Sequence, residues 1–369
     1  MKTGVLPDFM IKKLIDDGVI INADPNLVGT SGLDLRTGLK KWKLLGDFIP
    51  LPGQKIEEAF ESKNICDSSS TRERFYLDRS QPYAIELKER LFLPSTIGAK
   101  IFNKSSRARV AVASKGLTDG TPHFDIVPNE YNGKLYSEVS TTAFPLVINE
   151  GDSISQIRFY QGNPDPITGS QLEVLLKNYP ILTDDCGNPA YDAKGLEHII
   201  RTGRLTFTAD LSQEGVIAYI ANKDGRNFDL SVCNTYRPED YFNEVRYKNG
   251  GGNILIIHPG DFVLIRSREN IRLPPSIAAE IAPYTTELGD MKTSYANLIN
   301  CKHGWGIEKP SYIIFEIRAL DTPIIIQHSQ QLAKIDLYCM LEEPEGNYIP
   351  GNTDFEDLKS LLPGQFKKD

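Results

Sequence analysis

The chain has 369 residues, of which 41 are basic and 49 acidic, giving a formal net charge of -8 at pH 7. Its 40% hydrophobic and 24% charged residues are ordinary for a globular protein, and its length favours about two domains. The acidic balance argues against a nucleic-acid polymer as partner, because neutralising many phosphates needs an excess of Lys and Arg. A local basic pocket for a small phosphate stays open.

The N-terminal segment predicts a helix and no targeting sequence. The chain reaches the charged residues Asp8 and Lys12 without the apolar core of a signal peptide, and no later apolar run approaches the roughly 20 residues that a membrane helix needs. We therefore expect a cytoplasmic protein that does not act at a membrane. A helix is predicted over residues 7–17, because Pro7 suits a first turn and Gly18 ends the apolar stripe.

Most other predicted elements are short strands. Segments rich in β-branched and aromatic residues are separated by clusters of turn-forming residues. The clearest of these strands cover residues 135–139, 145–148, 154–159 and 312–317. Such spacing predicts a β-barrel or sandwich rather than alternating β and α units. Helices are expected only at the periphery, with a second one starting near Thr353 and ending before Pro363.

The chain also repeats itself. Residues 83–101 (YAIELKERLFLPSTIGAKI) match residues 263–281 (VLIRSRENIRLPPSIAAEI), and the register continues with Glu138 against Glu316. Each half of the chain therefore holds one copy of the same unit, and the length of the chain reflects a duplication.

The duplication predicts a domain organisation. A weaker correspondence, GLDL at 32–35 against TADL at 208–211, extends the repeat towards the start of each half. A polar segment containing Gly and Pro joins the halves. The expected parts are a first repeat with the catalytic motifs (1–165), a linker region (166–203), a second, degenerate repeat (204–345), and a C-terminal tail with a short helix (346–369).

The densest polar cluster follows a strand-like segment in the first repeat and reads Lys104-Ser105-Ser106-Arg107-Ala108-Arg109. Its arginine forks and serine hydroxyls suit the coordination of phosphate oxygens, although such a run is also typical of a solvated surface. The second repeat has residues 284–289 (YTTELG) at the equivalent positions. Because a phosphate site needs basic side chains only in the copy that works, this asymmetry favours a site.

Two carboxylate candidates lie further along the first repeat. Asp119 belongs to a turn-rich loop and suits either lining a site or making a turn. Glu138 shares a strand face with Tyr136, where it is either exposed or held in a pocket whose desolvation raises its pKa towards the range useful for proton transfer. Its counterpart Glu316 has Arg318 on the same face, so a structural salt bridge is at least as plausible there as catalysis.

Several metal and nucleotide motifs are missing from the sequence. The chain has no GxxxxGK[ST] phosphate loop, no GxGxxG, HExxH or GxSxG motif, and no zinc nucleoside-deaminase signature. Its 5 cysteines have no zinc-site spacing, so they are expected to be free thiols. Any hydrolytic chemistry is therefore expected to manage without zinc.

Three motifs occur in an order that resembles one family of nucleotide enzymes. They are Leu33-Asp34-Leu35-Arg36-x-Gly38, Lys104-Ser105-Ser106-x-Ala108-Arg109 and Gly133-x4-Glu138. With the similar segments 4–8 and 151–159, they make the chain similar to the long, duplicated bacterial form of dCTP deaminase, in the dUTPase-like superfamily. The resemblance covers nearly the whole chain. It implies a mainly β fold of two tandem dUTPase-like distorted β-barrel (β-clip) repeats with a few peripheral helices. It also implies a homo-oligomer, with a trimer favoured and active sites at subunit interfaces.

The resemblance further implies a reaction and its residues. The expected substrate is dCTP, a small molecule hydrolysed to dUTP and ammonia in a step that feeds thymidylate synthesis. Glu138 matches the glutamate that acts as general base and then acid, and Ser105 matches the serine that orients the attacking water. Nucleotide and phosphate contacts are expected from Lys104, Ser106, Arg109, Thr118, Asp119, Asp125 and Gln156. Mg²⁺ is expected to accompany the triphosphate without a protein ligand, and no zinc is implied.

Some features leave alternatives open. Between Thr118 and Gly133 the chain has more residues than the family pattern, so Asp125 is assigned to the deoxyribose only by its position. The alternatives are a bifunctional dCTP deaminase and dUTP pyrophosphatase, a dUTPase, and a non-catalytic nucleotide-binding regulator of the same fold. The tail at 348–352 lacks the Gly-rich arm, bearing Arg and Ser, with which dUTPases close their sites. The second repeat keeps Glu316 without the phosphate cluster, which suggests a structural or interface role.

Overall fold

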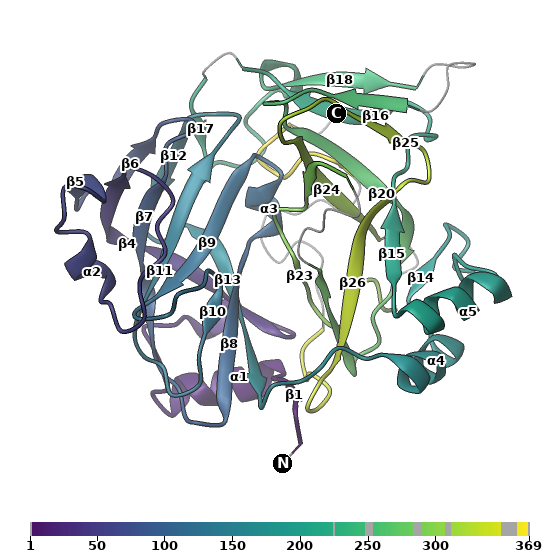
Figure 1. Cartoon of the computed structure of the whole chain (residues 1–369), viewed down its shortest axis with the longest axis horizontal. Coiled ribbons are helices and arrows are strands. Elements are labelled where there is room, and N and C mark those ends of the chain that lie inside the picture. Colours follow the sequence, from purple (N-terminus) through teal and green to yellow (C-terminus); the bar gives the residue numbers. More distant parts are fainter. Residues whose placement is uncertain are drawn as a thin grey trace. The chain divides into compact units, whose positions relative to one another are not determined.

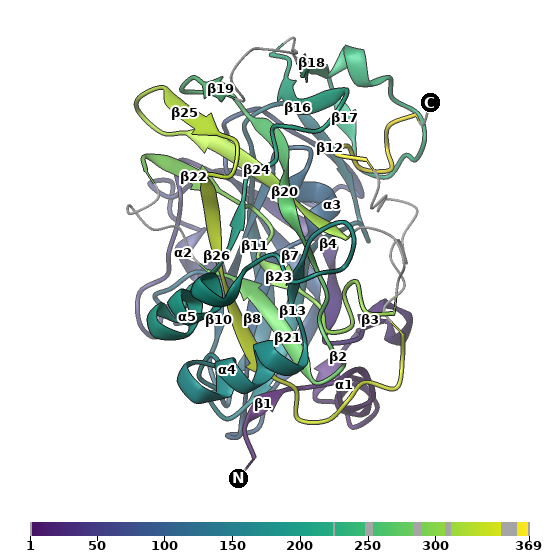
Figure 2. The same cartoon turned by 90° about the vertical axis from the view of Figure 1, so that its right-hand side faces the viewer.

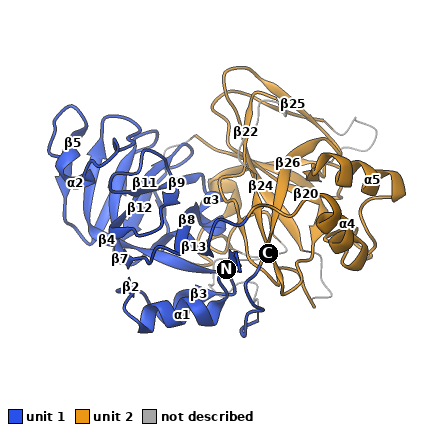
Figure 3. Cartoon of the chain, turned by 60° about the horizontal axis from the view of Figure 1, so that its bottom comes forward, with its two compact units in different colours: residues 1–164, 225–232, 340–347 blue, residues 165–224, 233–339, 348–369 orange. Residues whose placement is uncertain are grey.

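The computed structural model describes residues 2–223, 226–247, 254–282, 289–306, 311–347 and 360–367. The chain forms two compact units, which are coloured separately in Figure 3. Unit 1 comprises Met1–Pro164, Gly225–Val232 and Met340–Asn347, and unit 2 comprises Asp165–Asp224, Cys233–Cys339 and Tyr348–Asp369. Unit 1 therefore includes two short segments from the second half of the chain.

The predicted N-terminal helix is confirmed as α1 (Asp8–Asp16), which begins directly after Pro7. Both carboxylate oxygens of Asp8 accept backbone amides, from Glu345 at 3.0 Å and from Gly346 at 2.7 Å. The start of α1 therefore holds the returning C-terminal segment of unit 1 in place.

The main sheet of unit 1 is nearly barrel-shaped, which confirms the predicted fold class (Figure 1). Its strands follow the order β10 (Ile126–Val127), β8 (Ile97–Asn103), β13 (Ser153–Gln161), β4 (Gly32–Leu44), β7 (Tyr83–Phe92), β11 (Asn132–Thr141) and β9 (Val112–Thr118). Asp125 links β8 to β9, because its carbonyl accepts from Ile101 N and its own N–H donates to the Gly116 carbonyl, each at 2.9 Å. Gly116 permits this approach, since a Cβ there would lie 2.5 Å from the Cβ of Ile101.

Shorter elements complete unit 1. They are β1 (Gly4–Val5), β2 (Ile20–Ile21), η1 (Pro25–Leu27), β3 (Val28–Gly29), α2 (Ile56–Ala59), β5 (Cys66–Ser70), β6 (Arg74–Leu77), α3 (Ser105–Ala108), β12 (Leu146–Asn149) and β17 (Phe228–Asp229). Strand β12 pairs with β6 on one side and with β17 on the other. The ring of Phe228 stacks on Phe144 with centroids 6.0 Å apart, so a short segment from the second half of the chain is packed into unit 1.

The two faces of β11 contact different apolar clusters, because side chains alternate along a strand. Leu135 belongs to a cluster that includes residues of α1. Tyr136 points the other way and belongs to a second group, here called the aromatic cluster, whose rings are Trp42, Phe48, Phe60 and Tyr136. Phe48 and Phe60 come from the segment between β4 and β5, which carries α2, so this segment covers one face of the sheet.

Unit 2 repeats the main strand pairings of unit 1 (Figure 2). Its elements are α4 (Gly169–Asn178), β14 (Leu182–Thr183), α5 (Ala193–Thr202), β15 (Leu205–Thr208), β16 (Val216–Ala221), η2 (Pro238–Asp240), β18 (Phe242–Arg246), β19 (Ile254–Ile257), β20 (Val263–Ile271), β21 (Ile277–Ile281), β22 (Met291–Thr293), β23 (Leu298–Ile299), β24 (Tyr312–Ala319), β25 (Ile324–Gln327) and β26 (Gln331–Cys339). Strand β20 pairs with β24 as β7 pairs with β11, and β21 pairs with β26 as β8 pairs with β13. The predicted duplication is therefore present in the structure.

One predicted correspondence between the repeats is wrong. Leu205 pairs with Ile335 of β26 in the way that Leu33 pairs with Ile157 of β13. The counterpart of the GLDL motif therefore lies at the start of β15, and the TADL segment that begins at Thr208 follows it. The shared Asp-Leu pair was misleading because strand register depends on pairing along the whole strand and not on one dipeptide.

Residues 166–203, expected to be a linker region, contain the two helices α4 and α5, which lie side by side (Figures 1 and 2). Leu172, Leu176 and Ile199 on these helices are buried in the core of unit 2. Many residues of the segment are polar, and some of its apolar side chains are spaced as on one face of a short helix. This spacing was missed in the sequence analysis. None of the described helices is long and apolar enough to cross a membrane.

Residues 360–367 of the C-terminal tail pack into unit 2. The ring of Phe366 lies 5.9 Å from Tyr241 and 5.6 Å from Phe242, measured between centroids. The start of the helix predicted near Thr353 lies outside the described residues.

Candidate active site

Glu138 lies in the middle of β11, where it is opposite Ala84 of β7 and Lys115 of β9. Its side chain is only 2% exposed. One carboxylate oxygen, Oε2, accepts the N–H of Phe48 at 2.8 Å, and the other, Oε1, accepts from Lys115 Nζ at 3.1 Å. Glu138 shares its face of the strand with Tyr136 and the aromatic cluster, so of the two predicted settings the structure has the buried one.

This setting changes the proton affinity of Glu138. Burial raises the pKa of its carboxyl group to about 6, although the charge of Lys115 and the N–H of Phe48 act in the opposite direction. A group with a pKa near 6 changes its protonation state close to neutral pH. It can therefore accept a proton and return it, as general acid–base catalysis requires.

Lys115 and Asp47 extend the same group of residues. Lys115 Nζ bonds to the carboxylate of Asp47 and lies 4.5 Å from the ring centroid of Phe124. Burial alone would lower the pKa of Lys115, but its hydrogen bonds to Asp47 and Glu138 and their charges raise it. Lys115 therefore stays an ammonium ion beside the carboxylate. Glu138, Lys115, Asp47 and Phe48 are called the Glu138 cluster below.

The predicted phosphate cluster forms the short helix α3 between β8 and β9. Ser106 is fully buried, and its hydroxyl has no hydrogen-bond partner within the described residues. Arg109 is 3% exposed, whereas Ser105 is half-buried. Arg107 has a structural contact, because its guanidinium donates to the carbonyls of Ser153 at 3.0 Å and Leu230 at 2.6 Å. The hydroxyl of Ser106 is thus a buried polar group of this cluster that no contact within the described residues occupies.

Lys104 and Gln156 meet through a third side chain, Asp34. Lys104 Nζ bonds to Asp34 Oδ2, and Gln156 Nε2 donates to Asp34 Oδ1 at 2.6 Å. The side chain of Lys104 is 3% exposed. The structure therefore joins two predicted binding residues around an acid that belongs to the LDLR motif.

The three candidates at the end of β9 and in the loop after it are engaged in local contacts. Thr118 Oγ1 donates to the carbonyl of Ile126 at 3.0 Å. Asp119 accepts the N–H of Ile56 at the start of α2 at 3.0 Å. Asp125 accepts the N–H of Gly116 at 2.6 Å and has a left-handed backbone with φ of +66°. These contacts hold the loop to its neighbours, whatever further role the side chains have.

The predicted site residues thus form four groups in unit 1: the Glu138 cluster, helix α3, the contacts of Lys104 and Gln156 with Asp34, and the contacts at the end of β9 and in the loop after it. The separation of Glu138 from α3 follows from the β9–β11 ladder. None of the hydrogen bonds of Glu138 in the described chain joins it to Ser105 or Ser106. Strand β9 begins after α3 at Val112, which pairs with Thr141 of β11. Glu138 pairs with Lys115 further along the same ladder, about 10 Å from that end at the usual rise per residue.

Sequence reasoning missed several members of these groups. The position of Lys115 was accessible in principle, since antiparallel pairing of the strands on either side of the loop places it opposite Glu138. Asp47 and Phe48 come from an irregular segment with no periodic pattern, and no signal in the sequence connects them to Glu138. Asp34 stood within a recognised motif without an assigned role.

Within the residues that the structure describes, no three or more His, Cys, Asp or Glu side chains lie together so that they could hold a metal ion. The cysteines all lie in described segments and are free thiols, as predicted.

The corresponding glutamate of unit 2 has different surroundings. Glu316 is fully buried and accepts the N–H of Tyr295 at 2.9 Å. The alternative of a salt bridge between Glu316 and Arg318 does not occur among the described contacts, in which the side chain of Arg318 bonds to Tyr295 Oη at 3.4 Å. Tyr295 therefore contacts both residues. The counterpart phosphate positions 284–288 lie outside the described residues.

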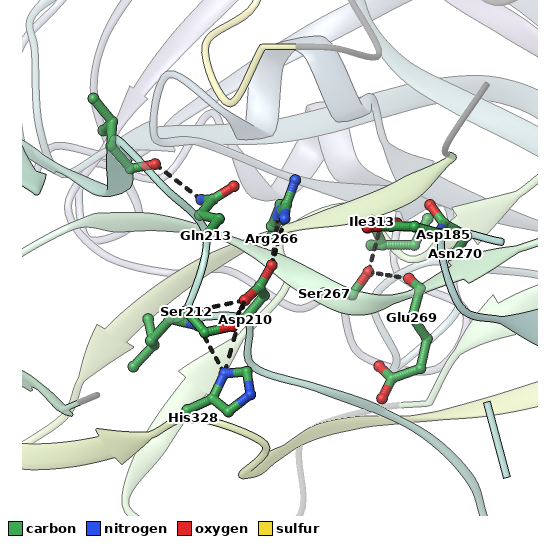
Figure 4. A network of polar contacts seen from close by, with 12 residues as sticks. Asp185, Asp210, Ser212, Gln213, Arg266, Ser267, Glu269, Asn270, Ile313 and His328 are labelled. Carbon is green, nitrogen blue, oxygen red and sulfur yellow. Dashed lines mark hydrogen bonds and ion pairs between the residues drawn. The ribbon is translucent and has the colours of Figure 1, made fainter. Parts of the chain in front are cut away.

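Asp210, in the TADL segment, also differs from Asp34. Figure 4 shows it bound to Arg266, whose Nε lies 2.8 Å away, and next to Ser212 and His328. It has neither a lysine nor a glutamine partner like those of Asp34 in this described network. Asp34 and Asp210, which have similar sequence surroundings in the two repeats, therefore make different contacts.

Comparisons with family models and with a solved structure point to the same protein family. Residues 2–163 match the 2′-deoxycytidine 5′-triphosphate deaminase N-terminal domain, and residues 188–357 match the C-terminal domain of the same family. A crystal structure of 2′-deoxycytidine 5′-triphosphate deaminase from Agrobacterium tumefaciens is 25% identical, covers 92% of this chain and 100% of its own, and superposes with a TM-score of 0.82. A salicylate 1,2-dioxygenase from Pseudaminobacter salicylatoxidans is 9% identical over 70% of each chain and has a TM-score of 0.14. This similarity supports no assignment. No curated protein sequence matches the chain.

Proposed function

Because the chain belongs to the 2′-deoxycytidine 5′-triphosphate deaminase family of enzymes, we propose that it hydrolyses dCTP to dUTP and ammonia with Glu138 as the proton carrier. The observation that carries the proposal is the setting of Glu138. Its carboxyl group is buried, is held at both oxygens, and has a pKa raised to about 6. Such a group is suited to act as a base and as an acid within one reaction cycle.

The proposed steps conserve all atoms and protons. Glu138 takes a proton from water while the resulting hydroxide adds to C4 of the cytosine ring, and the proton passes to ring N3. From the tetrahedral intermediate, Glu138 transfers the hydroxyl proton to the exocyclic amine. The C4–N bond then breaks, ammonia leaves, and the uracil ring of dUTP forms. In this reaction the carboxylate of Glu138 carries each proton that is transferred.

Helix α3 is proposed to bind the triphosphate. Its support is the pair of buried residues Ser106 and Arg109, of which Ser106 has a hydroxyl without a partner in the described chain. A buried polar group without a partner destabilises the fold, and a phosphate oxygen would satisfy it. Ser105 is proposed to orient the attacking water, and Lys104 and Gln156 to contribute to the nucleotide site together with Asp34. Mg²⁺ is proposed to accompany the triphosphate as its counter-ion, where it would neutralise part of the charge.

An indirect role is proposed for Thr118, Asp119 and Asp125. Their side chains hold the loop after β9, next to the segment that carries Phe48. They are therefore proposed to shape the sugar and base pocket through this loop. Direct contact with the nucleotide stays a prediction for each of them.

The assembly and location of the enzyme belong to the same proposal. We expect a cytoplasmic homo-oligomer, with a trimer favoured, whose product dUTP serves thymidylate synthesis. Sedimentation of the purified chain tests the oligomer.

The activity is tested by following ammonia and dUTP formation from dCTP with Mg²⁺. We expect both products in equal amounts, with no release of pyrophosphate. Glu138→Gln should lower kcat by at least about 100-fold, because general acid–base catalysis contributes factors of that size, while binding of dCTP persists. The matched control is Glu316→Gln, which changes the counterpart residue of unit 2 and should leave kcat within a factor of about 3.

Other outcomes would redirect the assignment. An undiminished rate in Glu138→Gln, or no ammonia from dCTP, would contradict the proposal. Release of pyrophosphate would indicate the bifunctional enzyme or a dUTPase. Tight nucleotide binding without turnover of any cytosine or uracil nucleotide would indicate a regulator.

A further inference from the structure

Lys115 connects β9 to the segment that covers Glu138. Its Nζ lies 3.1 Å from Glu138 Oε1, bonds to the carboxylate of Asp47, and lies 4.5 Å from the ring centroid of Phe124. The other oxygen of Glu138 is held by the N–H of Phe48 at 2.8 Å. Among the described residues, each carboxylate oxygen therefore has one donor, and the donor supplied by a side chain is Lys115.

We propose that Lys115 is a positioning residue for Glu138, which orients the carboxylate and supplies the positive charge that keeps it ionised in the free enzyme. The inference rests on the proposed function, in which Glu138 must begin the reaction cycle as a base. Lys115 acts through Glu138 and is not assigned a contact with the nucleotide.

The second repeat provides an internal comparison. Glu316 has the strand position of Glu138 and likewise accepts one backbone N–H, from Tyr295 at 2.9 Å. Thr293 pairs with Ile317, which places Ser294 opposite Glu316, where unit 1 has Lys115. The N–H of Ser294 donates to the carbonyl of Glu316 at 3.0 Å. The ladder therefore forms without a lysine at this position, and the lysine occurs in the repeat that also carries the phosphate cluster.

The charges around Glu138 define what the loss of Lys115 would do. Strand β9 contributes Lys115, which is 25% exposed, and the segment before α2 contributes Asp47, which is 65% exposed. Strand β7 presents the uncharged Ala84 opposite Glu138. Burial and the charge of Asp47 both favour the protonated acid, whereas Lys115 favours the carboxylate. Without Lys115, the N–H of Phe48 still favours the carboxylate, but burial and the charge of Asp47 both favour the protonated acid.

The test compares the proton affinity of Glu138 in the full chain with and without the lysine. ¹³C NMR of labelled glutamate, with Glu138→Gln to assign the signal, should show the pKa of Glu138 rising by about one unit or more in Lys115→Met, since an opposite charge at this range shifts a carboxyl group by that amount. The acid limb of the pH profile of kcat/KM should move with it, with about a tenfold lower value at pH 5. Lys115→Arg retains a cation and should restore most of both.

The matched control is Lys43→Met. Lys43 lies on β4 and pairs with Asp78 at 3.3 Å, away from the Glu138 cluster, so its loss should leave the titration and the pH profile unchanged. An unchanged titration of Glu138 in Lys115→Met would overturn the inference even with full turnover of dCTP. If that variant does not fold, Lys115→Gln is measured under the same criterion. No ammonia release by the wild-type chain would overturn the proposed function instead, and the NMR titration still reports on Lys115.

Discussion

Glu138 occupies a position where its proposed chemistry and the stability of the fold make opposite demands. The side chain is 2% exposed and packs beside the aromatic cluster, so the charged carboxylate loses most of its hydration. An apolar side chain at this position would suit the packing better. The carboxylate, with its pKa raised to about 6, suits proton transfer. Buried ionisable groups of this kind are common at functional sites.

The first prediction follows from the pKa of Glu138. Because the folded-state pKa is raised from 4.5 to about 6, proton binding stabilises the fold. This stabilisation is complete below pH 4.5 and is lost as the pH rises through 6. Glu138→Gln should therefore increase the free energy of unfolding at pH 8 by up to about 2 kcal/mol, and the gain should disappear at pH 4. Urea unfolding at both pH values measures this.

A control separates this effect from general surface charge. Glu173→Gln changes an exposed glutamate that pairs with Lys177 on α4, and it should show no such difference between pH 8 and pH 4. A loss of stability in Glu138→Gln at pH 8 would contradict the argument, since it would mean that the charged form stabilises the fold.

At the scale of elements, regular strands were predictable and the irregular segment between β4 and β5 was not. The strand 135–139 was found because its side chains alternate, and the structure contains it within β11. The segment before α2 has no such pattern, yet it supplies Phe48 and Asp47 to Glu138. Its course is set by contacts with distant residues, such as the bond from Gly120 N to the Gln54 carbonyl at 2.8 Å. Such contacts leave no local trace in the sequence.

A second prediction concerns Asp119, whose role the sequence left open. Its carboxylate accepts the N–H of Ile56 at 3.0 Å and pairs with Lys55 at 3.0 Å, at the start of α2. Asp119→Ala should lower the free energy of unfolding by about 1 kcal/mol, as the loss of a helix cap does. Hydrogen exchange should increase in residues 53–60. Asp119→Asn keeps an oxygen for Ile56 and should retain most of the stability.

The same pair of variants distinguishes anchoring from nucleotide binding. If Asp119 acts by anchoring α2, Asp119→Asn should have a KM for dCTP near that of the wild type. A raised KM in Asp119→Asn with unchanged hydrogen exchange in 53–60 would instead assign the carboxylate to the nucleotide.

At the scale of the whole molecule, the duplication was readable in the sequence but the composition of unit 1 was not. Matching strands such as 83–101 and 263–281 reveal the repeat because buried strand residues recur in the same order. Unit 1, however, also includes Gly225–Val232 and Met340–Asn347. These segments are too short to carry a pattern of their own, and they join unit 1 through contacts with residues distant in the sequence, such as those of Asp8 with Glu345 and Gly346.

This composition leads to the last prediction. Phe228 is fully buried and stacks on Phe144, while β17 pairs with β12, although the two segments lie far apart in the sequence. Phe228→Ala should destabilise unit 1 by about 3–5 kcal/mol, as large-to-small changes of core aromatics do. Hydrogen exchange should increase in β12, while β20 of unit 2 keeps its protection.

The comparison variant is Phe207→Ala, which removes an equally buried ring from the core of unit 2 and should have the reverse pattern. If Phe228→Ala changed hydrogen exchange only in unit 2, the segment Gly225–Val232 would stabilise unit 2, to which its neighbours in the sequence belong. If the predicted pattern is found, a residue from the second half of the chain supports the unit that carries Glu138. The deaminase site would then depend on both halves of the duplication, although its proposed chemical groups come from the first.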